Sequence, residues 1–534
     1  MTISQWLLAL VPVVCSLFAV RGILHYFQLE SYQFPGYFRT LSRNKMHGWL
    51  PGVLTSLGCM ALFYAFDVLG LREGGQGWRV FIQILVLPLA AGFGWLISRL
   101  LNESKAKKPF VFTGRVKRLY CVLLLVMLGL SLWLAQSPLA VLPCLWPLGL
   151  PLVVALAGLL AWPIEKLISE MYFRDARRKL LSNPRLIRIG ITGSYGKTSV
   201  KHILGTLLSE KYPTLITPAS FNTPMGVSRA IREKLTPSYQ VFVGEMGARH
   251  VGDIREMCRL VKPTIGILTS VGPQHLDTFK TVQRVAKTKF ELMEALPQDG
   301  HGYFFDDGAI CKELYGKMEK PKTLVSLTPG QADCWCEKIE VSPSGCSFDL
   351  HLKGKGSISC RTFLLGEHNI QNILLAAAVA SDLGLSLKQI AHGISQLMPV
   401  KNRLELIAHA GSFTIINDAF NSNPVGAKAA LKVLASFPQR RIIITPGMVE
   451  LGEKEAEYNQ EFGRAIAQSA DIAIVIGKKR AVPILQGLAQ GGFPPENIHQ
   501  VGSLNESTSV LHSLVRPTDT VLYENDLPDN YQEA

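Results

Sequence analysis

The hydrophobic residues of this 534-residue chain are concentrated in its first third. Five stretches there lack charged side chains: Ile3–Val20, Trp49–Phe66, Val80–Ser98, Leu119–Gln136 and Pro138–Pro163. A helix of about 20 apolar residues spans the hydrocarbon core of a bilayer. A single stretch is compatible with a buried helix, but five in succession favour a membrane domain. The pattern therefore predicts about five transmembrane helices.

Basic residues are concentrated in alternate connections between these stretches. They are frequent in 21–48, in 99–118 and directly after residue 164, whereas the other two connections hold only Arg72 and Arg79. Loops rich in Lys and Arg stay on the cytoplasmic side, so the distribution predicts an external N-terminus and a cytoplasmic remainder after residue 164. The same loops account for much of the net charge of +14, so the charge indicates membrane topology and no nucleic-acid partner.

From residue 185 onward, short apolar runs alternate with amphipathic runs. This rhythm is typical of a mainly parallel sheet covered by helices on both faces. Strands are expected at 186–192, 214–218, 240–246, 264–271, 413–417, 441–445, 472–476 and 520–523, and helices at 251–260, 282–295 and 369–383. The predicted organisation is a helical membrane domain (1–183) with an amphipathic connector at 165–181, followed by central (184–398) and C-terminal (399–534) α/β domains.

The ten cysteines allow two interpretations. A cytoplasmic chain is not expected to form disulfides, yet Cys334, Cys336, Cys346 and Cys360 are close enough in sequence to suggest a zinc site. The segment 334–352 alternates like a β-hairpin, and no C-x-x-C pair is present. Structural cysteines are therefore favoured over zinc.

A glycine-rich turn follows the first expected strand. Residues 186–199 read Leu-Ile-Arg-Ile-Gly-Ile-Thr-Gly-Ser-Tyr-Gly-Lys-Thr-Ser, and a helix-like run begins at Val200. Such turns let backbone N–H groups close on phosphate oxygens, while a lysine adds positive charge and a hydroxyl reaches Mg²⁺. The spacing is incomplete, because Ile191 stands where the full motif has its first glycine. Nucleotide phosphate binding is nevertheless favoured over a purely structural turn.

Three further positions are suited to chemistry. Glu245 ends an expected strand, where a carboxylate beside a phosphate loop can hold Mg²⁺. His275 ends another, and metal or substrate contact is favoured there over an ordinary loop histidine. Lys287 and Lys289 lie on one expected helix, where a solvated lysine is the simpler interpretation of either.

Together these motifs resemble the Mur ligases. The matching segments are 192–199, 222–223, 245–250, His275, 289–292, 366–372 and 418–424, in the family's order and spacing. The resemblance covers roughly residues 184–510 and is closest to the members that add D-alanyl-D-alanine in peptidoglycan synthesis. It implies a central P-loop ATPase domain, a Rossmann-like C-terminal domain and an ATP-dependent carbon–nitrogen ligase.

The resemblance also implies roles for individual residues. ATP would phosphorylate a substrate carboxylate and an amine would attack the acyl phosphate, so ATP, Mg²⁺, a carboxylate and an amine are the expected partners. The implied nucleotide-binding residues are Gly193, Ser194, Gly196, Lys197, Thr198 and Ser199 at the phosphates, Asn369 and Asn372 at adenine, and Asp418 at ribose. The implied Mg²⁺ ligands are Thr198, Glu245, His275 and a carbamate on Lys289. The implied catalytic residues are Lys197, Lys289, His275 and Arg403, with Arg403 at the transferring phosphoryl group.

Several segments depart from the family pattern. Membrane stretches stand in place of the family's UDP-sugar-binding domain, Phe305-Asp306-Asp307 replaces Asn-x-Asp, and Asn402 replaces a glycine. An acidic segment at 523–531 replaces a basic Lys-Gly-Ser-Arg stretch, which would reverse the charge met by an incoming carboxylate.

The main interpretation is a multi-pass protein of the bacterial plasma membrane whose cytoplasmic part forms an amide bond on a carboxylate-bearing cell-envelope precursor. A narrower alternative is addition of D-alanyl-D-alanine to a UDP-linked precursor. A non-catalytic ATP-binding membrane scaffold is disfavoured, because it would need none of the catalytic residues. An ATP-driven transporter is disfavoured because the expected spans contain no charged residue that would mark a pathway.

Overall fold

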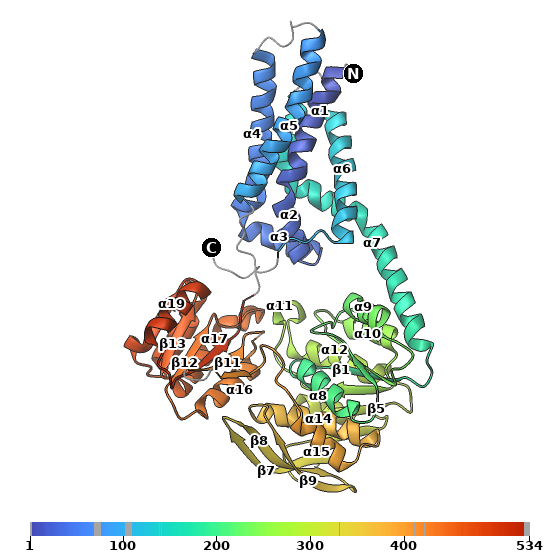
Figure 1. Cartoon of the computed structure of the whole chain (residues 1–534), viewed down its shortest axis with the longest axis vertical. Helices are drawn as coiled ribbons and strands as arrows, with labels where there is room; N and C mark the ends of the chain where they lie inside the picture. Colours follow the sequence, from blue (N-terminus) through green and yellow to red (C-terminus); the bar gives the residue numbers. More distant parts are fainter. Residues whose placement is uncertain are drawn as a thin grey trace. The chain divides into compact units, whose positions relative to one another are not determined.

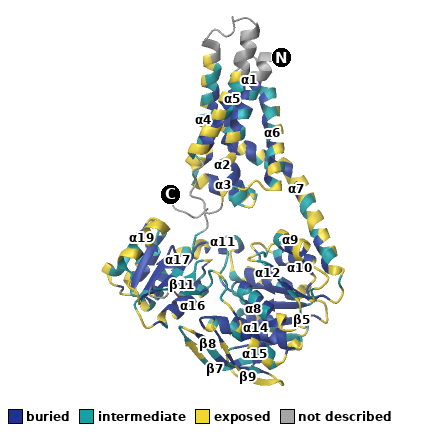
Figure 2. Ribbon diagram, viewed as in Figure 1, coloured by how far each residue is buried: buried dark blue, intermediate teal, exposed yellow. Residues whose placement is uncertain are grey.

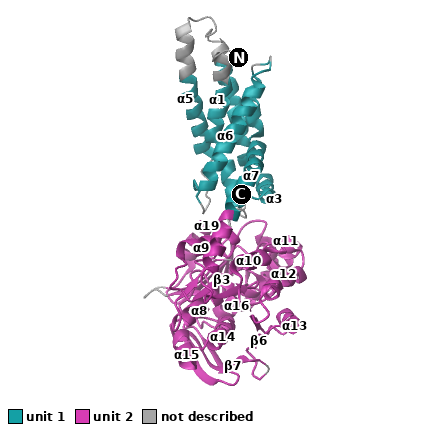
Figure 3. Cartoon of the chain, turned by 90° about the vertical axis from the view of Figure 1, so that its right-hand side faces the viewer, with its two compact units in different colours: residues 1–170 teal, residues 171–534 magenta. Residues whose placement is uncertain are grey.

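The computed structural model describes residues 3–68, 76–101, 109–137, 139, 141–330, 332–408, 413–420 and 422–527. Arg72, the basic run at 102–108, Asn421 and the end of the acidic segment at 528–531 lie outside the described residues. The chain forms two compact units, unit 1 (residues 1–170) and unit 2 (residues 171–534), which Figure 3 shows in different colours.

Unit 1 consists of helices (Figure 1). They are α1 (Ile3–Ala19), α2 (Arg21–Leu29), α3 (Phe34–Arg43), α4 (Lys45–Val68), α5 (Gln76–Leu101), α6 (Gly114–Leu134), two 3₁₀ helices, η1 (Leu142–Cys144) and η2 (Trp146–Gly149), and α7 (Leu150–Leu181). One hydrophobic core joins α1, α2 and α3 to α6 and α7, and a second joins α1 to α4 and α5. The helix α7 continues past residue 170 into unit 2.

Three helical segments in the described part of the chain are long and apolar enough to cross a membrane: Lys45–Ala65, Gly114–Leu134 and Leu142–Leu181. A fourth is obtained if α1 and α2, which are bent by 46° at their junction, count as one broken span, and Leu85–Leu101 of α5 is a shorter apolar helix. The large apolar side chains of Leu125, Trp133 and Trp162 on α6 and α7 are exposed. Figure 2 shows exposed segments along both helices. An exposed apolar surface of this kind indicates a covering partner.

The expected fifth span, Pro138–Pro163, corresponds to the candidate span Leu142–Leu181, but its first part is not regular α-helix. The chain there forms η1 and η2 before α7 begins at Leu150. Pro143 and Pro147 lie in these short helices, and proline lacks the N–H that a continuous helix needs. The expected connector at 165–181 is no separate element, because it is the second half of α7.

The central lobe of unit 2 is built around a nine-stranded sheet with the order β2-β3-β1-β4-β5-β6-β7-β8-β9. Its strands are β1 (Ile187–Thr192), β2 (Thr214–Ile216), β3 (Val241–Glu245), β4 (Ile265–Leu268), β5 (His301–Phe305), β6 (Lys322–Val325), β7 (Cys334–Ser342), β8 (Gly345–Leu352) and β9 (Gly356–Thr362). In this order, each neighbouring pair from the edge strand β2 as far as β7 is parallel. The pairs β7–β8 and β8–β9 are antiparallel. The expected parallel sheet and the hairpin at 334–352 are both present.

Helices cover both faces of this sheet. They are α8 (Lys197–Ser209), α9 (Pro224–Lys234), α10 (Asp253–Val261), α11 (Leu276–Phe279), α12 (Val282–Ala295), α13 (Ile310–Lys317), α14 (Glu367–Asp382) and α15 (Leu387–Ser395). One core packs α8, α14 and α15 on one face, and another packs α9, α10, α12 and the end of α7 on the other. The apolar strands therefore position the polar residues at their carboxyl ends.

The C-terminal lobe of unit 2 has a six-stranded sheet with the order β10-β11-β15-β12-β13-β14, in which only the edge strand β10 is antiparallel. The strands are β10 (Glu405–Ala408), β11 (Thr414–Asp418), β12 (Arg441–Thr445), β13 (Ile472–Ile476), β14 (Ile498–Val501) and β15 (Thr520–Glu524). The helices are α16 (Pro424–Ala435), η3 (Gly452–Lys454), α17 (Glu455–Ser469), α18 (Ala481–Gln490), η4 (Pro495–Asn497) and α19 (Leu504–Leu514).

The four cysteines considered for zinc are buried in the core of the central lobe. Cys334, Cys336, Cys346 and Cys360 pack there among aliphatic side chains. Within the described ranges, no group of three or more His, Cys, Asp or Glu residues is arranged to hold a metal. Their positions fit the structural interpretation.

Candidate active site

The phosphate loop lies between β1 and α8 and ends in a left-handed glycine. Gly196 has φ 78°, and a Cβ at this position would lie 2.6 Å from Oδ1 of Asn372. The Nζ of Lys197 donates to the carbonyl oxygens of Gly193 and Ser194, at 2.6 and 3.1 Å. Burial lowers the pKa of Lys197 to about 8, although the charge of Glu245 opposes the shift. The ammonium group of Lys197 thus lies against the carbonyls of its own phosphate loop.

Glu245, at the end of β3, is the centre of a buried polar group. Its Oε2 accepts hydrogen bonds from Thr198 Oγ1 and Lys201 Nζ, both at 3.1 Å, and its Oε1 accepts one from Asn222 Nδ2 at 3.2 Å. Glu245 and Lys201 are 1% and 0% exposed, so the ion pair is fully buried. Lys201 also donates to the carbonyl of Ala219. A carboxylate beside a threonine hydroxyl provides the oxygen donors that Mg²⁺ prefers, so these residues fit a magnesium site.

The two lysines of α12 have different environments. Lys287 is exposed, whereas Lys289 is 2% exposed. Burial and the charge of Lys197 lower the pKa of Lys289 well below its usual value, and Asp253 and Glu245 oppose this shift. Lys289 is therefore a buried amine close to the phosphate loop. Only Lys287 is a solvated lysine, as the simpler interpretation had expected for either.

His275 connects the two lobes of unit 2. Its Nδ1 lies 2.5 Å from Oε2 of Glu450, which belongs to the loop before η3 in the C-terminal lobe. The other oxygen of Glu450 accepts from Arg249 Nη2 at 3.4 Å. Both His275 and Glu450 have positive φ values, 51° and 64°, which are costly for residues other than glycine. The sequence had suggested a metal or substrate for His275, and the structure adds a carboxylate partner.

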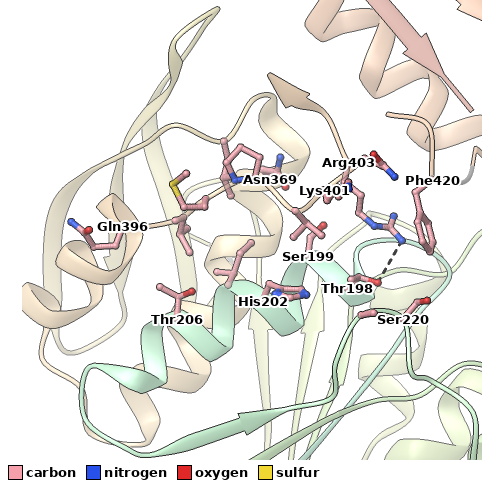
Figure 4. A pocket seen from close by; sticks show the side chains of 18 residues that line it. Thr198, Ser199, His202, Thr206, Ser220, Asn369, Gln396, Lys401, Arg403 and Phe420 are labelled. Carbon is pink, nitrogen blue, oxygen red and sulfur yellow. Dashed lines mark hydrogen bonds between the residues drawn. The ribbon is translucent and has the colours of Figure 1, made fainter. Parts of the chain in front are cut away.

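A cavity of about 530 Å³ lies in front of the phosphate loop (Figure 4). One wall is α8, from which Thr198, Ser199 and His202 face the cavity, and Asn369 lines it from α14. The opposite wall is the connection between the lobes, 396–403, together with Phe420. A cavity of this size, with apolar and amide groups beside a phosphate loop, fits a nucleoside triphosphate.

Arg403 reaches from this connection to the phosphate loop. Its Nη2 lies 3.5 Å from Thr198 Oγ1, and its guanidinium lies 4.4 Å from the centre of the Phe420 ring. Burial lowers the pKa of Arg403, and the charges of Asp418 and Glu245 oppose this. The structure therefore unites Lys197, Thr198, Glu245 and Arg403 at one place.

The remaining expected nucleotide residues lie close by. The amide of Asn369 donates to the Leu365 carbonyl at 2.9 Å, and Asn372 packs against Gly196 while donating to Asn369 at 3.4 Å. Asp418 Oδ1 accepts a hydrogen bond from the backbone amide of Leu404 at 3.2 Å. Leu404 directly follows Arg403 in sequence.

Comparison with known proteins identifies the family to which this site belongs. The family profile "Mur ligase middle domain" matches residues 191–380, and "Mur ligase, glutamate ligase domain" matches 402–523. The UDP-N-acetylmuramoyl-tripeptide–D-alanyl-D-alanine ligase of Escherichia coli is 32% identical over 305 residues, covering 57% of this chain and 67% of the relative. This chain belongs to the Mur ligase family. It is an ATP-dependent carbon–nitrogen ligase.

Other relatives agree with this assignment. The Bacillus subtilis protein of the same name is 27% identical over 332 residues, which cover 61% of this ligase and 69% of the relative. The crystal structure of MurF from Acinetobacter baumannii superposes with a TM-score of 0.61 at 26% identity, covering 68% of this ligase and 78% of that chain. MurF from Thermotoga maritima, solved with ADP, has the same fold, with a TM-score of 0.60 at 23% identity and a coverage of 67% and 80%.

Two departures from the family pattern have local explanations in the ligase. Asn402, in place of a glycine, has φ 60°, a conformation that asparagine tolerates better than most residues. Its Oδ1 accepts from Asn417 Nδ2 at 2.9 Å. Asp307 accepts hydrogen bonds from the amides of Ala309 and Cys311, so it caps the start of α13.

The acidic segment at 523–531 was expected to reverse the charge met by an incoming carboxylate. One of its acidic residues, Glu524, is 1% exposed and lies in the interior of the lobe. Its Oε1 accepts from Ser422 Oγ at 2.6 Å, and its strand neighbour is Asp418. Glu524 therefore belongs to the surroundings of Asp418 inside the lobe.

Sequence reasoning missed two residues of this site, Lys201 and Glu450, and placed Glu524 in an acidic segment without its buried partner. Lys201 lies one helical turn after Lys197, so helical spacing could have placed it on the same face of α8. Glu450 and Glu524 are loop and strand-end residues of the C-terminal lobe, and their partners are distant in sequence. No local signal pointed to either.

Proposed function

We propose that the ligase adds D-alanyl-D-alanine to a muramoyl-tripeptide precursor of peptidoglycan. Every relative cited above at the sequence level carries that activity in its name, which favours this narrower interpretation over ligation on an unspecified envelope precursor. The observation that carries the proposal is the arrangement of Lys197, Thr198, Glu245 and Arg403 around one phosphate loop.

The proposed reaction has two steps. A carboxylate oxygen of the acceptor attacks the γ-phosphorus of ATP, the bond to the bridging oxygen breaks, and ADP leaves. The neutral amine of the dipeptide then attacks the acyl phosphate, the tetrahedral intermediate expels phosphate, and the proton of the amine goes to solvent. One ATP is consumed for each amide bond.

The residues of this chain have separate tasks in that reaction. Lys197 and Arg403 place positive charge where negative charge develops on the transferring phosphoryl oxygens. Thr198 and Glu245 would hold Mg²⁺, which neutralises phosphate charge when bound. Asn369 and the connection at 396–403 would hold the nucleoside. We propose that Lys289 reacts with CO₂ to form a carbamate, and that this carbamate and His275 serve a second Mg²⁺.

We further propose that unit 1 is a membrane domain and that the active site works at the cytoplasmic face of the bacterial plasma membrane. The exposed apolar side chains of α6 and α7 and the basic connections between the apolar helices support this. The match covers 67% of the Escherichia coli relative, so part of that protein has no counterpart in the matched region. A precursor presented at the membrane is therefore a candidate acceptor beside the UDP-linked one.

The test uses the full-length ligase in lipid nanodiscs. It is incubated with ATP, Mg²⁺, D-alanyl-D-alanine and a muramoyl tripeptide that is linked either to UDP or to a polyprenyl pyrophosphate. ADP release is followed, and products are weighed by mass spectrometry. We expect a product heavier by one dipeptide minus water, which is lost in Lys197→Ala. ATP hydrolysis without product would exclude this amine, and absence of both would support the scaffold.

A further inference from the structure

Two carboxyl groups lie side by side at the ends of neighbouring strands in the C-terminal lobe. Asp418 ends β11 and Glu524 ends β15, and the register of the parallel pair places them directly opposite each other. Oε1 of Glu524 accepts from Ser422 Oγ at 2.6 Å. Oε2 is buried and has no hydrogen-bond partner among the described residues. The side chains of Asp418 and Glu524 interact with each other, and two unprotonated carboxylates would have no donor for that contact.

The surroundings of the pair favour retention of one proton. Burial and the charge of Asp418 raise the pKa of Glu524 well above its usual value, and burial raises the pKa of Asp418 to about 6. The charged group that acts on the pair from another element is Arg403, which opposes the shift of Asp418. Two adjacent carboxyls that cannot both ionise share a proton.

The pair is connected to the nucleotide site through Asp418. Its Oδ1 accepts from the amide of Leu404, and Arg403 is the preceding residue. The guanidinium of Arg403 reaches within 3.5 Å of Thr198 Oγ1 on the phosphate loop. A change in the charge or position of Asp418 therefore acts on the arginine that faces the triphosphate.

We propose that Glu524 is a positioning residue: as a neutral acid it donates its proton to Asp418 and so keeps one negative charge opposite Arg403. This inference rests on the proposed use of the site for ATP. Loss of the shared proton at high pH leaves two negative charges side by side, of which Glu524 is fully buried. Their repulsion displaces Asp418, and with it the backbone at Leu404 and the side chain of Arg403.

The experiment compares the full-length ligase with Glu524→Gln, which retains a hydrogen-bond donor but cannot ionise. The affinity for a non-hydrolysable ATP analogue with Mg²⁺ is measured by calorimetry between about pH 6.5 and 9. In the wild type we expect the affinity to fall about fivefold more over this range than in Glu524→Gln. Glu496→Gln, an exposed residue of the same lobe, serves as the control and should follow the wild type.

A second measurement does not depend on the ligand. Infrared difference spectra of the wild type at neutral pH should contain the C=O band of a protonated carboxyl group, and Glu524→Gln should lack it. The inference would be overturned if the analogue affinity had the same pH dependence in the wild type and in Glu524→Gln. It would also be overturned if the C=O band were the same in both proteins. A wild type that fails to bind the analogue at any pH would instead contradict the proposed function, and the infrared result would still decide whether the proton is present.

Discussion

His275 and Glu450 come from different lobes of unit 2 and meet with 2.5 Å between Nδ1 and Oε2. They are 175 residues apart in the chain, and the short helices α11 and η3 that follow them also contact each other. A carboxylate at one ring nitrogen fixes the orientation of the imidazole and leaves the other nitrogen for a metal or substrate. The contact therefore couples the approach of the C-terminal lobe, which carries Arg403, to the state of His275.

Removal of Glu450 should impair the reaction more than the fold. We expect Glu450→Ala to lower kcat by about 10- to 100-fold, as is usual when the carboxylate partner of a functional histidine is lost. Glu450→Gln should have a smaller effect because it can still accept a hydrogen bond. Steady-state ADP release measures both. Glu453→Ala, an exposed residue of the adjacent helix η3, is the matched control, and an equal loss in that variant would contradict the role of Glu450.

The buried ion pair of Lys201 and Glu245 should contribute strongly to stability. Lys201→Met leaves Glu245 as an uncompensated buried charge, which typically costs about 3–5 kcal/mol. The free energy of unfolding of unit 2 should fall accordingly in thermal denaturation. Since Glu245 would then lack its cation, added Mg²⁺ should raise the Tm of Lys201→Met more than that of the wild type. Lys234 is exposed, so Lys234→Met should match the wild type both in Tm and in the change of Tm on addition of Mg²⁺. If Mg²⁺ does not change the Tm of Lys201→Met, this would argue against a metal at Glu245.

Lys289 should carry a carbamate when CO₂ is available. Only a neutral amine attacks CO₂, and burial together with Lys197 lowers the pKa of Lys289 well below its usual value. This shift favours the neutral amine, so the carbamate should form without alkaline conditions. ¹³C NMR after addition of labelled bicarbonate should show a carbamate signal that disappears in Lys289→Ala. Lys287 is exposed, so Lys287→Ala should retain the signal. Loss of the signal in Lys287→Ala would contradict the assignment of the carbamate to Lys289.

The parts of the fold that the sequence predicted are those with a local signal. The bounds of β12, β13 and α12 agree with the expected ranges, because each is a distinct apolar or amphipathic run between polar turns. Four short strands, β5, β6, β10 and β14, were not expected. The fifth apolar stretch was taken as one helix although its prolines force 3₁₀ turns before Leu150.

The candidate site divides in the same way. Gly196, Lys197, Thr198 and Glu245 were found because a glycine-rich turn and a strand end have recognisable patterns. The partners Glu450 and Glu524 were not, because the contacts that define them exist only after the lobes fold and meet. Their function depends on the partners that they meet in the folded chain, His275 for Glu450, and Ser422 and Asp418 for Glu524.

The close approach of Asn372 to Gly196 predicts a specific requirement for glycine in the phosphate loop. In Gly196→Ala the new methyl group would lie 2.6 Å from Asn372 Oδ1, and the backbone would keep a φ of 78° that alanine disfavours. We expect the loop to shift and the affinity for an ATP analogue to fall at least about tenfold, which corresponds to roughly 1.4 kcal/mol. Asn372→Ala in the same background removes the contact but not the backbone strain, so it should restore only part of the affinity. Gly316→Ala is the control, because its site in α13 has open space and an ordinary helical backbone. Full restoration by Asn372→Ala would assign the whole effect to the contact, and unchanged affinity in Gly196→Ala would mean that the loop does not close on phosphate in this conformation.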